Sequence, residues 1–250
     1  MQADLTWPKE RRNLAWFGAR DGDRILELGC GPGWITEKLS EAFPHSRITA
    51  LDHNPAALDF ARGRLERRLG DRIEWTTGKA EQTRLPDKCF DIVYARLVFY
   101  YLPDPVAAAA EARRVLRPGG RFVVTDSDDG LFGVTVPELP ELELLLARVG
   151  ASKSRSGGDR RRGRLLRNVL AKAGFDPIDL EAIGFDSGEI GAEKFFPLFD
   201  PEPLQRLVAS GEITPAEAAR LADARKRFLA DPDAYVLRIL LMLCGRNPPQ

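Results

Sequence analysis

The chain has 250 residues, of which 44% are hydrophobic, and its 37 basic side chains balance 37 acidic ones. This length is enough to bury the core of one large globular domain. A neutral chain has no overall attraction to nucleic acid or to an anionic membrane, so we expect neither as a partner. No apolar run reaches the roughly 20 residues of a membrane span, and the charged N-terminus does not look like a signal peptide. Three widely separated cysteines predict neither a disulfide framework nor a metal site, and they favour a cytoplasmic location.

Strand-like and helix-like segments alternate through the first half of the chain. Short apolar runs of strand length occupy residues 24–28, 47–51, 72–76, 90–95 and 121–125. Helical spacing fills the stretches between them at 34–43, 55–69 and 105–116. This alternation predicts an α/β fold with a Rossmann-like, doubly wound, mostly parallel sheet whose ligand-binding loops gather at the carboxyl ends of the strands.

The second half of the chain loses this regular alternation. Residues 131–164 are rich in Pro, Leu and Arg and predict an insertion, followed by a helix of about ten residues that ends near Gly174. Further predicted elements are a sixth strand at 175–183, helical stretches at 192–210 and 215–229, and a last strand at 234–244. Thr214 and Glu217 form a capping-box pattern that marks the start of the second helical stretch. We therefore expect helical insertions after the fifth and sixth strands and an antiparallel last strand.

The clearest chemical signal is a glycine-rich turn directly after the first strand. Gly29, Gly31 and Gly33 alternate, and glycine allows both tight turning and close approach of the backbone to a ligand. A dinucleotide site would have a small residue where Trp34 stands, and Glu27 would repel a phosphate. Glu27 could instead accept a hydrogen bond from a ligand amine or from a backbone N–H. The turn therefore argues against a dinucleotide ligand.

Asp52 ends the second strand about twenty residues beyond the glycines, where doubly wound folds place a carboxylate that binds ribose hydroxyls. Three later segments keep a matching order and spacing: Phe-Asp-Ile-Val at 90–93, Leu-Pro-Asp-Pro at 102–105 and Val-Leu-Arg-Pro-Gly-Gly at 115–120. Together with Glu27 and the glycine turn, these motifs resemble the class I S-adenosylmethionine-dependent methyltransferases, in the branch that contains small-molecule and quinone-pathway enzymes. The resemblance covers about residues 24–125.

The resemblance implies that the chain binds S-adenosylmethionine, releases S-adenosylhomocysteine, uses no metal and methylates an O, N or C nucleophile of a small molecule. The residues that it places at the cofactor are Glu27, Gly29, Cys30, Gly31 and Gly33 at the turn, Asp52 at the ribose, His53, Ala80 and Glu81 around the adenine, and Arg96 through its backbone at the methionine. Lys79 departs from the family pattern, because many relatives have an acid there and a lysine cannot accept a hydrogen bond. We therefore expect the backbone near Ala80 to bind the adenine.

We expect residues 1–250 to form one domain, in which different segments bind the cofactor and cover the acceptor. We expect residues 1–20 to form a helical cover over the cofactor and residues 21–130 to form the cofactor-binding core. Residues 131–164 and 191–231 are then available to cover the acceptor, since ligands at the carboxyl edge of an open sheet need protection from water. The aromatic residues at 195, 196 and 199 either line that acceptor pocket or only dock the insertion onto the sheet.

Several functional questions stay open at this level. No motif identifies a catalytic base; Asp126, Asp128 and Asp129 follow the fifth strand and are candidates for acceptor binding or proton removal, or else for turn formation. A methyltransferase acting on RNA or protein would require the arginines between 155 and 167 to form one basic surface. A non-catalytic cofactor-binding protein would keep the same glycines and Asp52. The oligomeric state, the acceptor and the methylated atom are not encoded in any motif.

Overall fold

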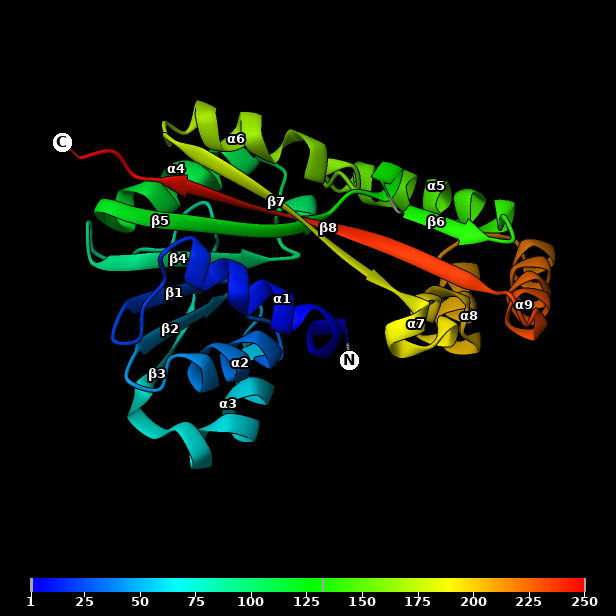
Figure 1. Cartoon of the computed structure of the whole chain (residues 1–250), viewed down its shortest axis with the longest axis horizontal. Coiled ribbons are helices and arrows are strands. Elements are labelled where there is room, and N and C mark those ends of the chain that lie inside the picture. The colour runs from blue at the N-terminus through cyan, green and yellow to red at the C-terminus, as the bar shows by residue number, and fades with distance from the viewer. Residues whose placement is uncertain (1, 132, 250) are drawn as a thin grey trace.

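The computed structural model describes residues 2–131 and 133–249; residues 1, 132 and 250, which fall within predicted segments, lie outside the described residues. One twisted sheet runs through the molecule, with helices on both faces (Figure 1). The strands are β1 Arg24–Leu28, β2 Arg47–Asp52, β3 Ile73–Thr77, β4 Phe90–Arg96, β5 Leu116–Ser127, β6 Gly133–Val136, β7 Ile178–Asp186 and β8 Tyr235–Arg246. The α-helices are α1 Gln2–Trp16, α2 Trp34–Ala42, α3 Pro55–Leu69, α4 Pro105–Val115, α5 Pro140–Arg155, α6 Leu166–Lys172, α7 Ser187–Ile190, α8 Pro201–Ala209 and α9 Pro215–Ala230.

The strand order is β3-β2-β1-β4-β5-β8-β6, and β7 pairs with the other side of β8. Strands β1 to β5 are parallel, whereas β8 runs antiparallel to β5, β6 and β7. The predicted doubly wound, mostly parallel sheet with an antiparallel last strand is therefore confirmed. Leu28 pairs with both Leu51 and Ala95, so β1, β2 and β4 end side by side at one edge. That edge carries the glycine turn.

The alternation of side chains along β1 explains how the sheet is covered on both faces. Ile25 packs into the apolar core shared with α1, α2 and α3, while Leu26 and Leu28 pack into the core shared with α4 and α6. Because successive side chains of a strand point to opposite faces, Glu27 lies on the face of α1 and α2. Burial on both faces is why the central strands read as continuous apolar runs.

The insertions lie beyond the carboxyl ends of the central strands, where β6, α5 and α7 to α9 form one end of the molecule (Figure 1). The predicted capping box is present, with the Thr214 hydroxyl accepting from the Glu217 N–H. Three predicted details were wrong. Strand β6 was not expected, and the sixth strand lies at 178–186. The stretch 192–210 is also not one helix: it breaks into the 3-10 turns η5 Ala192–Phe195 and η6 Pro197–Phe199 before α8, because proline cannot continue a helix. Within the described ranges, no helix combines the length and apolar character of a membrane span.

Candidate functional site

The glycine turn between β1 and α2 is held by backbone hydrogen bonds from both sides. The N–H groups of Gly29 and Cys30 donate to the Leu51 carbonyl at 2.7 and 3.0 Å, and the Gly33 N–H donates to the Cys30 carbonyl at 3.0 Å. The three glycines have φ values of +69°, +50° and +77°, in the left-handed region that favours glycine. The turn is thus fixed to the end of β2 by its own backbone.

The three glycines are required for different reasons. A Cβ on Gly29 would lie 2.5 Å from the Val98 side chain, and one on Gly33 would lie 2.9 Å from Ala61 of α3. Those two positions serve packing. A Cβ on Gly31 would meet no protein atom within 4 Å, so this part of the turn faces open space. Gly31 is therefore the position at which a ligand could approach the backbone most closely.

Asp52 joins the ends of β1 and β2. Its side chain is nearly buried, and its two oxygens accept from the Gly31 N–H at 2.8 Å and from the Asn54 N–H at 2.9 Å. A carboxylate oxygen can accept more than one hydrogen bond, so capacity remains for ligand hydroxyls beside Gly31. His53 is exposed, with its Nδ1 3.3 Å from the Asp52 carboxylate. The structure thus brings Asp52, His53 and the turn together.

Glu27 is buried beneath the turn and accepts a hydrogen bond from the Thr36 hydroxyl of α2 at 2.6 Å. Burial raises its pKa to about 7, and the nearby Asp52 charge acts in the same direction. The residue thus ties α2 to β1 through a side-chain partner that the sequence did not suggest.

Cys30 is also buried, and burial raises its thiol pKa well above the usual range. A thiol held in its neutral form is a poor nucleophile, which agrees with Cys30 being a small residue of the turn. Within the described residues, no three His, Cys, Asp or Glu side chains are grouped so as to hold a metal ion.

The loop after β3 reaches the same edge, because the Gly78 N–H donates to the Asp52 carbonyl at 3.0 Å. Ala80 is buried in this loop against the core that includes Leu28 and Leu51, and Glu81 is half-buried. The loop therefore begins directly beside the end of β2, where an adenine ring would have to lie if Asp52 binds the ribose.

The Arg96 side chain has a role that sequence reasoning missed. It is 8% exposed, and its Nε lies 3.0 Å from both carboxylate oxygens of Glu10 in α1, which is itself fully buried. The Tyr94 hydroxyl donates to the same carboxylate at 2.5 Å. Because 86 residues separate Glu10 from Arg96 and α1 carries other charged residues, no local pattern could have identified this pair.

Asp126 near the end of β5, and Asp128 and Asp129 directly after it, are engaged in structural contacts. Asp126 is fully buried and accepts from the N–H groups of Tyr100 and Ser127, and burial raises its pKa to about 7. Asp128 binds the Arg164 guanidinium through both oxygens at 2.7 Å, and Asp129 is paired with Arg160. These contacts favour turn formation and helix attachment over proton removal.

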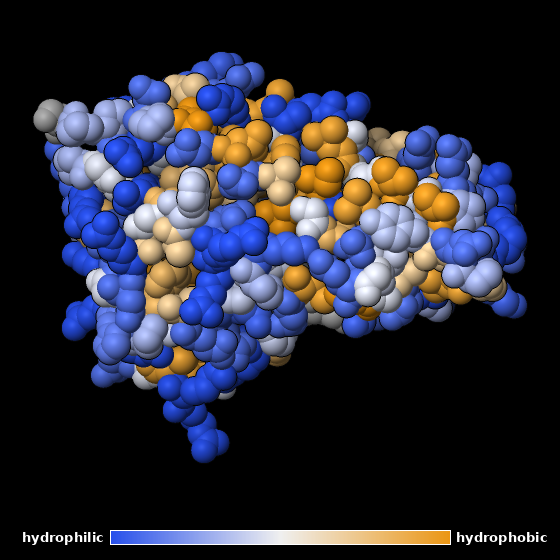
Figure 2. All heavy atoms as spheres, in the orientation of Figure 1, coloured by the Kyte–Doolittle hydropathy of each residue, from blue (hydrophilic) through white to orange (hydrophobic). Residues whose placement is uncertain are grey.

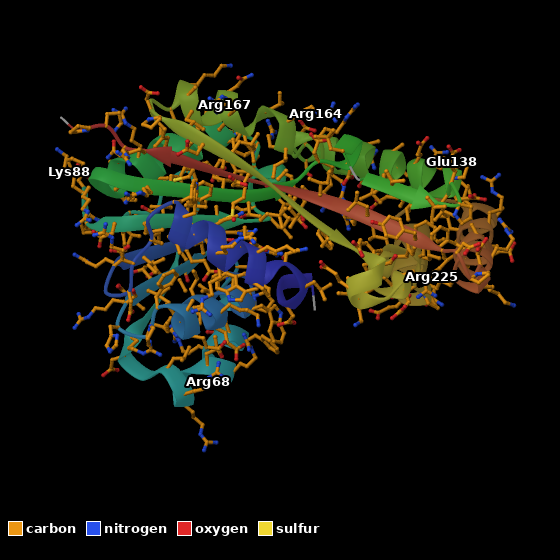
Figure 3. All side chains as sticks on the ribbon, in the orientation of Figure 1. Arg68, Lys88, Glu138, Arg164, Arg167 and Arg225 are labelled. Atoms are coloured by element: carbon orange, nitrogen blue, oxygen red, sulfur yellow. The ribbon has the colours of Figure 1, made fainter. Side chains whose placement is uncertain are left out.

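Two of the arginines between 155 and 167 form ion pairs, Arg160 with Asp129 and Arg164 with Asp128. Besides the two that pair with acids, Arg162 donates to the Leu102 carbonyl and Arg167 donates to the Ile178 carbonyl. Figure 3 shows Arg164 and Arg167 along the side of the molecule formed by the segment 162–165 and α6. Their charges are used to attach this segment to β5 and β7.

A cavity of about 1040 Å³ lies in the first insertion, between α5 and the segment from Asp129 to Val136. Val134, Leu139, Leu142 and Leu146 give it an apolar wall, and the ion pair of Asp129 with Arg160 lies at its polar end. Apolar atoms also gather on the surface over β8 and this insertion (Figure 2). None of the residues predicted to bind the cofactor lines the cavity.

The loop after β4 separates this cavity from the glycine turn. Val98 packs against Gly29 on one side, while the Arg160 guanidinium lies over the Tyr100 ring, 5.6 Å from its centre, on the other. The Asp159 N–H also donates to the Tyr100 carbonyl at 2.8 Å. The loop after β4 thus contacts the glycine turn through Val98 and residues of the cavity wall through Tyr100.

The aromatic residues of the second insertion are core residues. Phe195, Phe196 and Phe199 are 4%, 1% and 2% exposed. Phe196 packs edge-on against both Phe199 and Phe228, and Phe195 stacks on Phe185 of β7. Of the two possibilities that the sequence left open, these contacts favour docking over pocket lining.

Comparison with known proteins agrees with this geometry. Residues 26–124 match the profile of a family described as a methyltransferase domain. A malonyl-(acyl-carrier protein) O-methyltransferase of Paenibacillus is 32% identical over 184 residues, covering 71% of this chain and 63% of the relative. A ubiquinone/menaquinone biosynthesis C-methyltransferase of Paracoccus denitrificans is 36% identical over 117 residues, covering 45% and 46%. A second malonyl-(acyl-carrier protein) O-methyltransferase, from Hahella chejuensis, is matched over 34% of its length. The chain thus spans about one to two thirds of the lengths of these relatives.

Solved structures share the whole fold. A phosphoethanolamine N-methyltransferase of Haemonchus contortus, crystallised with S-adenosylhomocysteine, superimposes with a TM-score of 0.62 at 19% identity over 98% of this chain and 53% of its own. The cyclase SpnF superimposes with a TM-score of 0.61 at 23% identity, covering 96% and 81%. The fold and the glycine turn thus define a Rossmann-like methyltransferase domain. Residues 26–124 are the part of the chain that is similar to this methyltransferase family.

Proposed function

We propose that this chain binds S-adenosylmethionine at the carboxyl edge of β1 and β2 and transfers its methyl group to a small molecule in the cytoplasm. The observation that carries the proposal is Gly31, a left-handed glycine whose missing side chain leaves open space beside a nearly buried carboxylate. The backbone of Gly29, Cys30 and Gly33 would complete the cradle around the methionine part. The three free thiols are consistent with a reducing compartment.

The remaining cofactor contacts follow from the same edge. Asp52 would accept hydrogen bonds from the ribose hydroxyls, with His53 and the loop at Ala80 and Glu81 bordering the adenine, and the backbone at Arg96 would lie beside the methionine. Glu27 would hold α2 in place through Thr36. When bound, S-adenosylmethionine supplies a methyl group on a positively charged sulfonium. The protein's task is then mainly alignment, which can contribute on the order of 7 to 11 kcal/mol in favourable systems.

We propose that the first insertion holds the acceptor in its cavity and that the second insertion supports it from outside. The cavity adjoins the turn across the loop of Val98 and Tyr100, and its volume suits an organic molecule. Relatives that are named for ubiquinone/menaquinone biosynthesis and for trans-aconitate support a small acceptor. Two of the arginines in 155–167 are already paired with acids, which reduces the positive charge that this segment could offer to a phosphate backbone. The proposal involves no metal ion and leaves the oligomeric state open.

The direct test is calorimetric titration with S-adenosylmethionine and S-adenosylhomocysteine, followed by incubation with methyl-labelled cofactor and size-fractionated extracts. Binding of both nucleosides and transfer of label into a small-molecule fraction are expected. Since SpnF shares this fold and is named as a cyclase, binding without any transfer of label would show that the site is used for something other than methylation.

Replacing Asp52 by alanine should weaken S-adenosylhomocysteine binding by about 1.5 to 3 kcal/mol, the range for hydrogen bonds to a charged group. The loss has two sources, since Asp52 would contact the ribose and also holds the Gly31 N–H. Calorimetry measures the effect, with Asp59→Ala on the exposed surface of α3 as the control. Equal affinities in both variants would remove Asp52 from the site.

Replacing Ala147 by tryptophan should raise the acceptor KM about tenfold or more while S-adenosylhomocysteine affinity stays unchanged. Ala147 lines the cavity and is exposed, so an indole can enter the cavity without displacing core side chains. Steady-state kinetics with the acceptor identified by labelling measures whether the acceptor KM rises while the S-adenosylhomocysteine affinity stays the same. An unchanged KM would place the acceptor outside this cavity.

A further inference from the structure

Helix α1 contacts three separate parts of the protein through one short stretch of residues. Glu10 binds Arg96 at the end of β4, directly beside the start of the glycine turn. Asp4 is paired with Lys38 of α2 at 2.7 Å. Lys9 donates to the Gly184 carbonyl of β7 and to Glu189 of α7, both at 2.8 Å. The first half of α1 thus contacts the end of β4, helix α2, and the segment of β7 and α7 that leads into the second insertion.

The Glu10 carboxylate is buried, and both of its oxygens accept hydrogen bonds. Glu10 and Thr6 are both fully buried, and their oxygens accept from Arg96 and Tyr94 at distances between 2.5 and 3.0 Å. The Tyr94 hydroxyl also lies 3.2 Å from the Thr125 hydroxyl of β5. Removing one partner of such a buried pair leaves a charge without compensation, so the position of α1 and that of the β4 end depend on each other.

The contact at Lys9 has a different character. The side chains of Lys9 and Glu189 are 33% and 46% exposed, so solvent screens this ion pair and it adds little to stability. The same ammonium group also donates to the Gly184 carbonyl, so Lys9 links α1 to both β7 and α7. The adjacent residues Glu10 and Lys9 thus form a buried contact to the end of β4 and a solvent-exposed contact to α7.

We propose that Glu10 is a positioning residue through which cofactor binding orders α1, and that Lys9 transmits this ordering to α7, which leads into the second insertion. The proposal rests on the proposed function, because the cofactor must bind at the glycine turn beside Arg96. A ligand there would restrict the end of β4, and the buried pair would restrict α1 with it. Residues 187–195 would then become ordered only after the cofactor has bound.

Amide hydrogen exchange with and without S-adenosylhomocysteine tests this order of events. In the unaltered protein the nucleoside should slow exchange both in α1 and in residues 187–195. In Lys9→Met the protection of α1 and the affinity should stay within about twofold, and the protection of 187–195 should be lost. In Glu10→Gln both protections should be lost and the affinity should fall about tenfold. Arg12→Met, an exposed basic residue of the same helix, serves as the matched control and should behave as the unaltered protein.

The outcomes separate this inference from the proposed function. If the unaltered protein binds no S-adenosylhomocysteine, both fail. If it binds the nucleoside but 187–195 exchanges as before, or if Lys9→Met keeps the protection there, only the positioning role of α1 is overturned. Should Glu10→Gln fail to fold, the Lys9→Met comparison still decides, because that contact lies at the surface.

Discussion

Replacing Gly31 by valine should reduce S-adenosylhomocysteine binding by at least a hundredfold. A branched side chain would enter the open space beside Asp52 that the cofactor is proposed to fill. The left-handed backbone at +50° adds strain of about 1–2 kcal/mol for a residue with a Cβ. Calorimetric titration of the folded variant measures the loss.

Gly211 provides a matched control for this variant. It also has a left-handed φ, of +73°, and a Cβ there would also meet no atom within 4 Å, but it follows α8 far from the turn in the sequence. Gly211→Val should therefore carry similar strain and bind the nucleoside normally. If Gly31→Val also binds normally, the open space at the turn is not the cofactor site.

Replacing Phe196 by alanine should destabilise the protein by about 3–5 kcal/mol, the usual cost of removing a fully buried aromatic side chain. Phe196 is 1% exposed and contacts Phe199 and Phe228, so its removal opens a cavity within the second insertion, against α9. For a chain of this size the melting temperature should fall by roughly 2–4 °C per kcal/mol.

The exposed Phe60 is the control for that measurement. It is 57% exposed on α3, so Phe60→Ala should change stability by less than about 0.5 kcal/mol. Phe196→Ala should leave S-adenosylhomocysteine affinity intact below its melting temperature. A stable variant with an altered acceptor KM would instead show that Phe196 lines the acceptor pocket.

The parts of the fold that the sequence predicted are those set by local pattern. Strands β1, β2 and β4 are apolar runs buried on both faces, and the glycine turn and Asp52 follow their ends, so chain order alone places them at one edge. Strand β6 was missed because Gly133–Val136 is four residues long, and it exists only because the early part of β8 pairs with it.

The missed features of the site depend on long-range pairing in the same way. The partners of Arg96, Asp128 and Asp129 lie 31 to 86 residues away, and an acid or arginine in isolation does not reveal its partner. The aromatic cluster around Phe196 gave a pattern that fits either a pocket or a core. Only its burial against α9 distinguishes the two.

Strand β8 is the last element of the sheet in chain order, yet it is the central member of the antiparallel half, pairing with β5, β6 and β7. Until residues 235–246 have left the ribosome, the edges of β5 and β7 have no partner, and β6 has nothing to pair with. These strands therefore have unpaired edges during synthesis, and unpaired strand edges can pair with other chains. Because one strand then joins the core to both insertions, the finished protein should unfold in a single cooperative transition, with no stage in which the insertions melt alone.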